Sequence, residues 1–267
     1  MTGQPPSPHP DPDPAPEPGS GVVAARAGGT GARRSRLTRA LGVLGGAMGV
    51  CLTAASIGWF AVLPSYRPEL GPDERYGIDV SNHQNAVDWA EVADDGIDYA
   101  YMKATEGRTW VDKRFAENWR ASAAAGVTRG AYHFFSLCSS GAAQAANFLR
   151  TVPADPSALP PVVDLEHSPT TCPDRMDAGD LQRELTDFVA AVEAREGKRV
   201  VIYTLPRFVR DYPLPEHLTD RERWVRSLFR RPSTADWRIW QVSAMARVDG
   251  IDEPVDLDVW RVDPTAV

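Results

Sequence analysis

The chain has 267 residues, enough for one sizeable domain and additional segments. Its formal net charge is −7 and its sequence pI is about 5.3. This acidic balance argues against a nucleic-acid-binding protein, which would present a basic face to phosphates. The three cysteines have no metal-site spacing, so we predict no structural zinc.

The N-terminal segment, residues 1–40, is predicted to be a disordered tail. Proline and aspartate dominate residues 4–18, and glycine and alanine dominate residues 19–32. Such a composition offers too little apolar surface to offset the entropy that the chain would lose on ordering.

An uncharged apolar run, Leu41–Leu63, follows the tail and is preceded by Arg33, Arg34, Arg36 and Arg39. As a helix it would extend about 34 Å, enough to cross a bilayer, so we predict a single-pass membrane anchor. By the positive-inside bias, the N-terminus would be cytoplasmic and the rest of the chain extracellular, at the cell membrane. A cleaved signal peptide is one alternative, although the run is long for one. A buried core helix is another, although the run shows no amphipathic face.

Residues 64–75 are predicted to be a spacer, and residues 76–267 the catalytic-type domain. Strand and helix patterns alternate through the first part of this domain. Strands are expected at 76–80, 99–105, 127–135, 161–166 and 200–204, and helices at 89–94, 113–125, 142–149 and 178–196. Such alternation indicates a parallel sheet whose faces are covered by helices.

After residue 204 the pattern changes to strands with little helix between them. These strands are expected at 224–227, 237–243 and 255–260. Five βα units and three further strands make eight, the number that closes a barrel.

Acidic residues fall where several predicted strands end. They are Asp79 in the first strand, Asp164 and Glu166 in the fourth, and Asp256 in the last. The active sites of α/β barrels lie at the C-terminal ends of the strands. Asp164 and Glu166 are two positions apart, so both should point to the same face, and their proximity should raise the pKa of one of them. A glycosidase needs such a carboxyl pair. The alternative is an acidic pair that faces solvent at the start of a loop.

Aromatic and polar side chains accompany these carboxyl groups in the strands. Tyr101, Tyr203, Trp240 and Gln241 lie within predicted strands, and His133 is expected at a strand end on the active face. Aromatic faces suit a carbohydrate cleft, although large aromatics also pack in protein cores.

A serine hydrolase is disfavoured because the chain lacks a Gly-x-Ser-x-Gly motif. A cysteine protease is disfavoured because no helix begins directly after Cys138.

Together these segments resemble glycoside hydrolase family 25, the Chalaropsis-type lysozymes. The resemblance runs in order from Tyr76 to about Trp260. The principal matching segments are Gly77–Ser81, Asp88–Trp89, Tyr101–Gly107, Gly130–Phe134, Leu159–Glu166, Ile202–Thr204, Trp240–Ser243 and Val255–Asp258.

The resemblance implies an irregular TIM-like (β/α)5(β)3 barrel of the α/β class that cuts peptidoglycan glycan strands. The bond expected to be hydrolysed is the β-1,4 bond between N-acetylmuramic acid and N-acetylglucosamine. By position, Glu166 resembles the general acid and Asp164 its partner, which orients or polarises the 2-acetamido group of the substrate; Asp79 and Asp256 resemble the remaining acidic residues. No metal or organic cofactor is implied. The positions that resemble substrate-binding residues are Tyr101, Tyr132, His133, Tyr203 and Gln241.

The chain departs from the family pattern in its later part. Arg223–Ser227 replaces what is usually a Leu-Trp-x-Ala-x-Tyr strand, the basic segment Leu228–Arg231 follows, and Asp258 stands where asparagine is frequent. These departures keep a second hypothesis open, in which the domain is a non-catalytic peptidoglycan-binding module that tethers membrane to wall.

A disulfide between Cys138 and Cys172 is also predicted. The two cysteines follow the third and fourth strands, whose C-terminal ends should lie side by side, and the expected compartment is oxidising. The alternative is two separate thiols on diverging loops.

Overall fold

The computed structural model describes residues 30–167, 175–234 and 236–262 of the chain. Residues 1–29 of the predicted tail and Cys172 lie outside these ranges. The chain divides into two compact units, residues 1–53 and 54–267.

Helix α1 (Thr30–Ile57) begins within the stretch that we predicted to be disordered. A π-helical turn, Gly58–Val62, follows it. Apolar side chains of α1 such as Val43 and Val50 are exposed. In the described part of the chain, no helix combines the length and apolar character needed to cross a membrane.

The second unit is built around one sheet that closes on itself. Its strands are β1 (Glu74–Val80), β2 (Tyr99–Glu106), β3 (Trp110–Val111), β4 (Thr128–Phe134), β5 (Val162–Leu165), β6 (Val201–Thr204), β7 (Arg223–Arg226), β8 (Trp237–Ala246) and β9 (Val255–Arg261). They follow the order β1-β9-β8-β7-β6-β5-β4-β2-β3, and β1 also pairs with β2. The ring contains β1, β2 and β4–β9, because β3 pairs only at the end of β2.

The strands of the barrel run in the same direction except for the last one. Every pairing from β1 through β2, β4, β5, β6 and β7 to β8 is parallel. The last strand, β9, is antiparallel to both β8 and β1. The expected eight-stranded α/β barrel is thereby confirmed.

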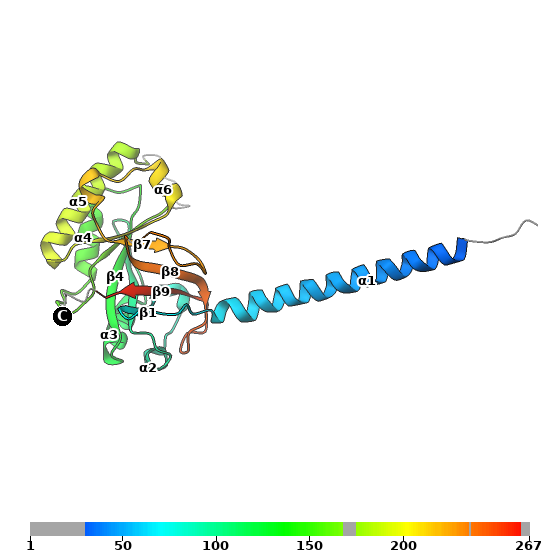
Figure 1. Cartoon of the computed structure of the whole chain (residues 1–267). Coiled ribbons are helices and arrows are strands. Elements are labelled where there is room, and N and C mark those ends of the chain that lie inside the picture. The colour runs from blue at the N-terminus through cyan, green and yellow to red at the C-terminus, as the bar shows by residue number, and fades with distance from the viewer. Residues whose placement is uncertain (1–29, 168–174, 235, 263–267) are drawn as a thin grey trace, which may run out of the picture. The chain divides into compact units, whose positions relative to one another are not determined.

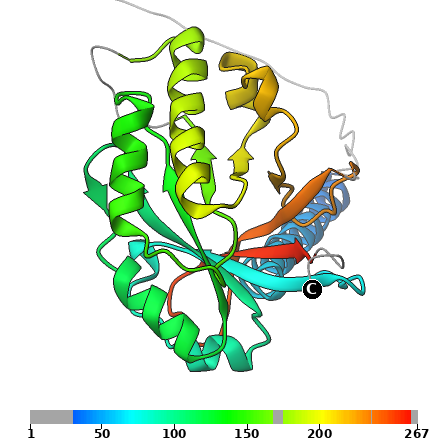
Figure 2. The same ribbon diagram turned by 90° about the vertical axis from the view of Figure 1, so that its left-hand side faces the viewer.

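Helices connect the first strands and pack outside the sheet (Figures 1 and 2). They are α2 (Trp89–Asp94), α3 (Phe115–Ala124), α4 (Gly141–Thr151), α5 (Ala178–Glu196) and the short α6 (Pro206–Asp211). Helix α5 buries the apolar stripe that its 3.6-residue period predicts. Asp177 caps its first turn, and Gly197 ends it in the left-handed conformation.

Side chains alternate between the barrel interior and the layer of helices. Ile78 and Val80 of β1 belong to the outer core beneath the helices. Tyr99 and Tyr101 of β2 belong to a separate inner cluster with Trp224. This inner cluster fills the barrel below the functional site, so the site has a closed floor.

The predicted spacer packs on the barrel. Pro64 is buried and its carbonyl accepts a hydrogen bond from the Arg247 amide, and Arg67 pairs with Asp95. The first strand begins at Glu74, two residues earlier than expected. The folded unit therefore includes residues that we assigned to a linker.

Candidate active site

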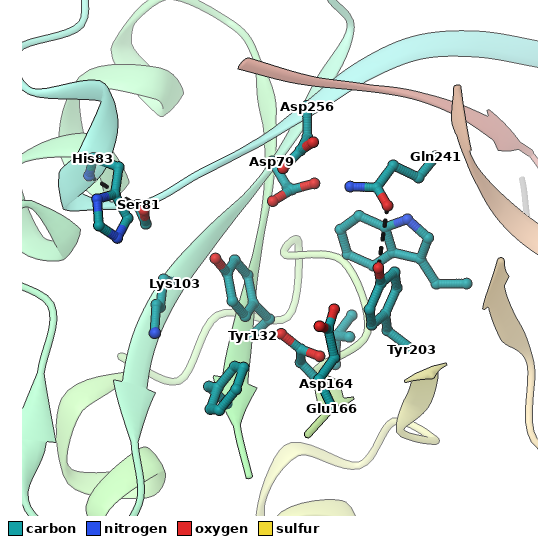
Figure 3. Close-up of a pocket in the computed structure, with 13 residues that line it drawn as sticks. Asp79, Ser81, His83, Lys103, Tyr132, Asp164, Glu166, Tyr203, Gln241 and Asp256 are labelled. Carbon is teal, nitrogen blue, oxygen red and sulfur yellow. Dashed lines mark hydrogen bonds between the residues drawn. The ribbon is translucent and has the colours of Figure 1, made fainter. Parts of the chain in front are cut away.

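A cleft of about 210 Å³ opens among the C-terminal ends of the parallel strands. All four acidic residues singled out from the sequence line it (Figure 3). Tyr132, Tyr203 and Gln241 line it too, as expected. Its other lining residues are Ser81, His83, Lys103, Phe134, Val162 and Trp224.

Asp164 and Glu166 stand at the end of β5. Asp164 shares the inward side of the strand with Val162, and Glu166 directly follows the strand. Among the described residues, Asp164 Oδ1 is buried without a hydrogen-bond partner. Burial, followed by the negative charge of Glu166, raises the pKa of Asp164 well above its usual range. Asp164 therefore holds a proton at higher pH than an ordinary aspartate.

Asp79 and Asp256 form the second acidic pair, on adjacent strands. They are partners in the β1–β9 ladder, and both carboxyl groups face the cleft (Figure 3). Burial and then the charge of Asp256 raise the pKa of Asp79 well above its usual range. Burial also raises the pKa of Asp256 to about 6, although Arg226 and a hydrogen bond with Gln241 act in the opposite direction.

Two cleft side chains orient one another next to this pair. The Tyr203 hydroxyl donates a hydrogen bond of 3.1 Å to Gln241 Oε1. The amide nitrogen of Gln241 is thereby turned toward Asp79 and Asp256 (Figure 3). A chain of polar groups thus leads from β6 through β8 to the acidic pair.

Lys103 also lines the cleft, and the sequence-based predictions included no role for it. Its Nζ atom forms a 2.7 Å ion pair with Glu106 and lies 4.7 Å from the ring centroid of Phe134 and 4.9 Å from that of Trp110. The residue lies two positions after Tyr101 on β2, within a quoted family segment. The two-residue spacing from Tyr101 could have indicated that Lys103 points to the barrel interior, because alternate residues of a strand share a face.

His133 and Tyr101 do not line the cleft, which corrects two predictions. His133 is fully buried on the helix side of β4, where it stacks on Phe188 at 4.8 Å between ring centroids. Tyr101 lies in the barrel floor, and its hydroxyl donates to the Pro160 carbonyl. Adjacent residues of one strand point to opposite sides, so Tyr132 and His133 could not both face the interior.

Asp258 lies buried on the inward side of β9, two positions after Asp256. It is fully buried, and its Oδ1 atom accepts a 3.0 Å hydrogen bond from Trp224 Nε1. Burial and the charge of Asp256 raise the pKa of Asp258 well above its usual range. This carboxyl group does not line the cleft, so it supports the site from behind.

Two of the three cysteines, Cys51 and Cys138, lie among the described residues. Cys138 is disulfide-bonded, and Cys51 on α1 is a free thiol. Cys172 lies outside the described residues, so the Cys138–Cys172 pairing stays a prediction.

Comparison with known proteins agrees with this geometry. Residues 78–251 match the family described as glycosyl hydrolases family 25. Lysozyme M1 of Streptomyces globisporus is 35% identical over 209 residues, covering 70% of this chain and 71% of that protein. An uncharacterized protein of Escherichia coli K12, YegX, is 37% identical over 194 residues, covering 70% and 69%.

Solved structures show the same architecture. A family 25 glycosyl hydrolase from Bacillus anthracis superposes with a TM-score of 0.66 at 30% identity, covering 75% of this chain and 94% of that one. The bacterial lysozyme from Streptomyces coelicolor gives a TM-score of 0.65 at 32% identity, covering 73% and 96%. The fold and the acidic cleft are those of a glycoside hydrolase. The chain belongs to glycosyl hydrolases family 25.

Proposed function

We propose that this protein is a muramidase, which hydrolyses the β-1,4 bond between N-acetylmuramic acid and N-acetylglucosamine in peptidoglycan. The observation that carries the proposal is the placement of Asp164 and Glu166 at the end of β5, in one cleft with Asp79 and Asp256. The lysozyme names of relatives such as Lysozyme M1 support it.

In the proposed reaction, Glu166 protonates the glycosidic oxygen of the leaving sugar. Asp164 orients the 2-acetamido group of the sugar whose bond is cut. Asp256 of the pair on β1 and β9 supplies negative charge for the oxocarbenium-like centre, and Gln241 helps to keep Asp256 ionised by hydrogen-bonding to it. The aromatic rings of Tyr132 and Tyr203 line the cavity that receives the sugar rings.

Replacement of the proposed acid tests this assignment. Glu166→Gln keeps the shape of the side chain and removes the transferable proton, so the hydrolysis rate should fall by about 10² to 10⁴. Glu117→Gln, on the exposed side of α3, is the matched control and should retain the wild-type rate. A rate near wild type in Glu166→Gln would remove Glu166 from the proposed role.

The identity of the cut bond needs a separate measurement. Purified peptidoglycan is digested, the fragments are reduced with borohydride, and the reduced sugar is identified by mass spectrometry. A reduced muramic acid supports a muramidase, whereas a reduced glucosamine contradicts it. Glycan binding without any new reducing end would support the wall-binding module instead.

The proposed place of action is the outer side of the cell membrane, with the run Leu41–Leu63 as the anchor. The support is the uncharged run Leu41–Leu63 behind four arginines and the exposed apolar side chains of α1. A reporter enzyme fused after Val267 should then be active only outside the cytoplasm. Activity confined to the cytoplasm would contradict this topology, and a secreted product without residues 41–63 would favour a cleaved signal peptide.

A further inference from the structure

Arg226 is a cationic residue at the C-terminal end of β7, next to strand residues that line the acidic cleft. It is the register partner of Gln241, which lines the cleft. It also lies two positions after Trp224, another lining residue, so both side chains leave the strand on the same side. The residue is exposed to solvent.

Within the described part of the chain, no contact neutralises the charge of Arg226. Among the described residues, its guanidinium group forms no salt bridge and no hydrogen bond. Burial raises the pKa of Asp256 and of the Tyr203 hydroxyl, and the positive charge of Arg226 acts against that rise at both cleft residues. Lys103, a cation that lines the cleft, is already paired with Glu106 at 2.7 Å.

We propose that Arg226 is a specificity-determining residue that binds a carboxylate group on the muramyl part of the glycan. This inference rests on the proposed function and deepens it. The cleft is lined by four carboxyl groups, and those that are ionised would repel an anionic substrate unless a cation faces its charge. A guanidinium group suits this task because its planar donors match a carboxylate in a bidentate pair.

A muramyl residue offers such a carboxylate in two chemical settings. Its lactyl group carries one when no peptide is attached, and a stem peptide carries its own when one is. Both present the same group to a guanidinium, so the experiment uses both glycans. Each glycan is also prepared with its carboxylates converted to methylamides, which removes the charge and leaves the sugar backbone intact.

The test compares the KM of the full-length wild type and of Arg226→Gln on these four substrates. On the glycan whose carboxylate binds Arg226, the substitution should raise KM about tenfold. This is the change expected when one charge-assisted hydrogen-bonded pair is lost at a partly exposed site. On the matching methylamide the two proteins should have the same KM. Arg226→Lys should recover part of the difference, and added salt should reduce it.

Arg199→Gln is the control for a simple loss of positive charge. Arg199 precedes β6 at the opposite end of the barrel, where it forms an exposed pair with Asp220. Its substitution changes the net charge equally and should leave all four KM values as in the wild type.

Two results would overturn the inference. One is an equal change in KM for free and blocked carboxylates, since that would show that Arg226 acts only through the ionisation of Asp256. The other is no change in KM on any substrate. Failure of the proposed function would look different, because the wild type itself would then release no muramic acid reducing ends from any of the glycans.

Discussion

Gly77 lies opposite Tyr99 in the β1–β2 ladder, and a Cβ atom on Gly77 would come within 2.1 Å of the tyrosine ring. Gly130 has the same relationship with Tyr101, at 2.2 Å. The missing side chains leave room for two tyrosine rings inside the barrel. Those rings form the floor beneath the cleft, so these glycines are required by packing.

Gly77→Ala should therefore destabilise the protein by about 3 kcal/mol, because the ring of Tyr99 is enclosed and cannot move away. The measurement is the melting temperature by calorimetry, and a fall of several degrees is expected for a domain of this size. Gly179→Ala is the control, since its Cβ would meet nothing closer than 3.4 Å. An unchanged melting temperature in Gly77→Ala would contradict the packing argument.

Asp164→Asn should stabilise the protein while it impairs catalysis. Burial makes the pKa of Asp164 higher in the folded state than in the unfolded state. The free energy of unfolding therefore falls as the pH rises above the pKa of the unfolded state, because the folded protein then has to ionise a buried group. Removing the charge should add about 1–2 kcal/mol at pH 7.5, because Oδ1 has no partner among the described residues. The gain should shrink toward pH 4, where the wild type is protonated as well.

The exposed Asp252→Asn is the matched control for this substitution, and its melting temperature should equal that of the wild type at both pH values. A lower melting temperature in Asp164→Asn at pH 7.5 would show that the carboxylate is a stabilising group. Turnover of peptidoglycan, measured on the same samples, should fall in Asp164→Asn alone.

His133 should make the protein less stable in acid. Burial lowers the pKa of His133 to about 4, although a hydrogen bond with Gln144 acts against this. Because Gln144 Nε2 donates to the carbonyls of Ser136 and Ser139, Gln144 Oε1 accepts from His133 Nε2, and His133 Nδ1 accepts from the Thr105 hydroxyl at 2.7 Å. The buried ring is therefore neutral.

The stability that depends on the neutral ring is present above pH 6.5 and is lost as the pH falls toward about 4. The loss should be on the order of 3 kcal/mol. In His133→Phe this part of the pH dependence should disappear, although the variant should be less stable at pH 7.5 because Thr105 and Gln144 lose a partner. Melting temperatures at pH 5 and 7.5 measure both effects, and an equally steep acid loss in His133→Phe would refute the assignment.

Glu74 should tie the supposed spacer to the barrel through Arg231. Burial would raise the pKa of Glu74, but hydrogen bonds from Arg231 at 2.6 and 2.9 Å and from the Gly71 amide lower it. The stabilisation is therefore present above the usual glutamate pKa and is lost as the pH falls below it. Glu74→Gln should lower stability by about 1–3 kcal/mol at pH 7.

Truncation measures the same contribution in another way. A chain that begins at Tyr76 should melt below one that begins at Pro64, because it lacks the Glu74–Arg231 and Arg67–Asp95 pairs. Equal melting temperatures would show that residues 64–75 are only a linker.

Much of the local structure was determined by the sequence alone. The bounds of α2 and α5 agree with the prediction to the residue, and a core-facing period marks α5. In the structure a capping aspartate precedes each of these helices. The acidic residues could be assigned to one cleft because parallel strands bring their C-terminal ends to the same edge of a barrel. That inference needs only the order of the strands.

The tertiary structure decided which side of each strand faces the cleft. The side-chain period of a strand is two, so a shift of one residue exchanges Tyr132 for His133, and both faces of a barrel strand are buried. The residue pattern of the strand therefore could not show that the side chain of His133 faces the layer of helices. The pairing of Arg226 with Gln241 and the packing of Glu74 on Arg231 also depend on partners far away in the chain. Local sequence patterns contain no information on such contacts, because closure of the barrel creates them.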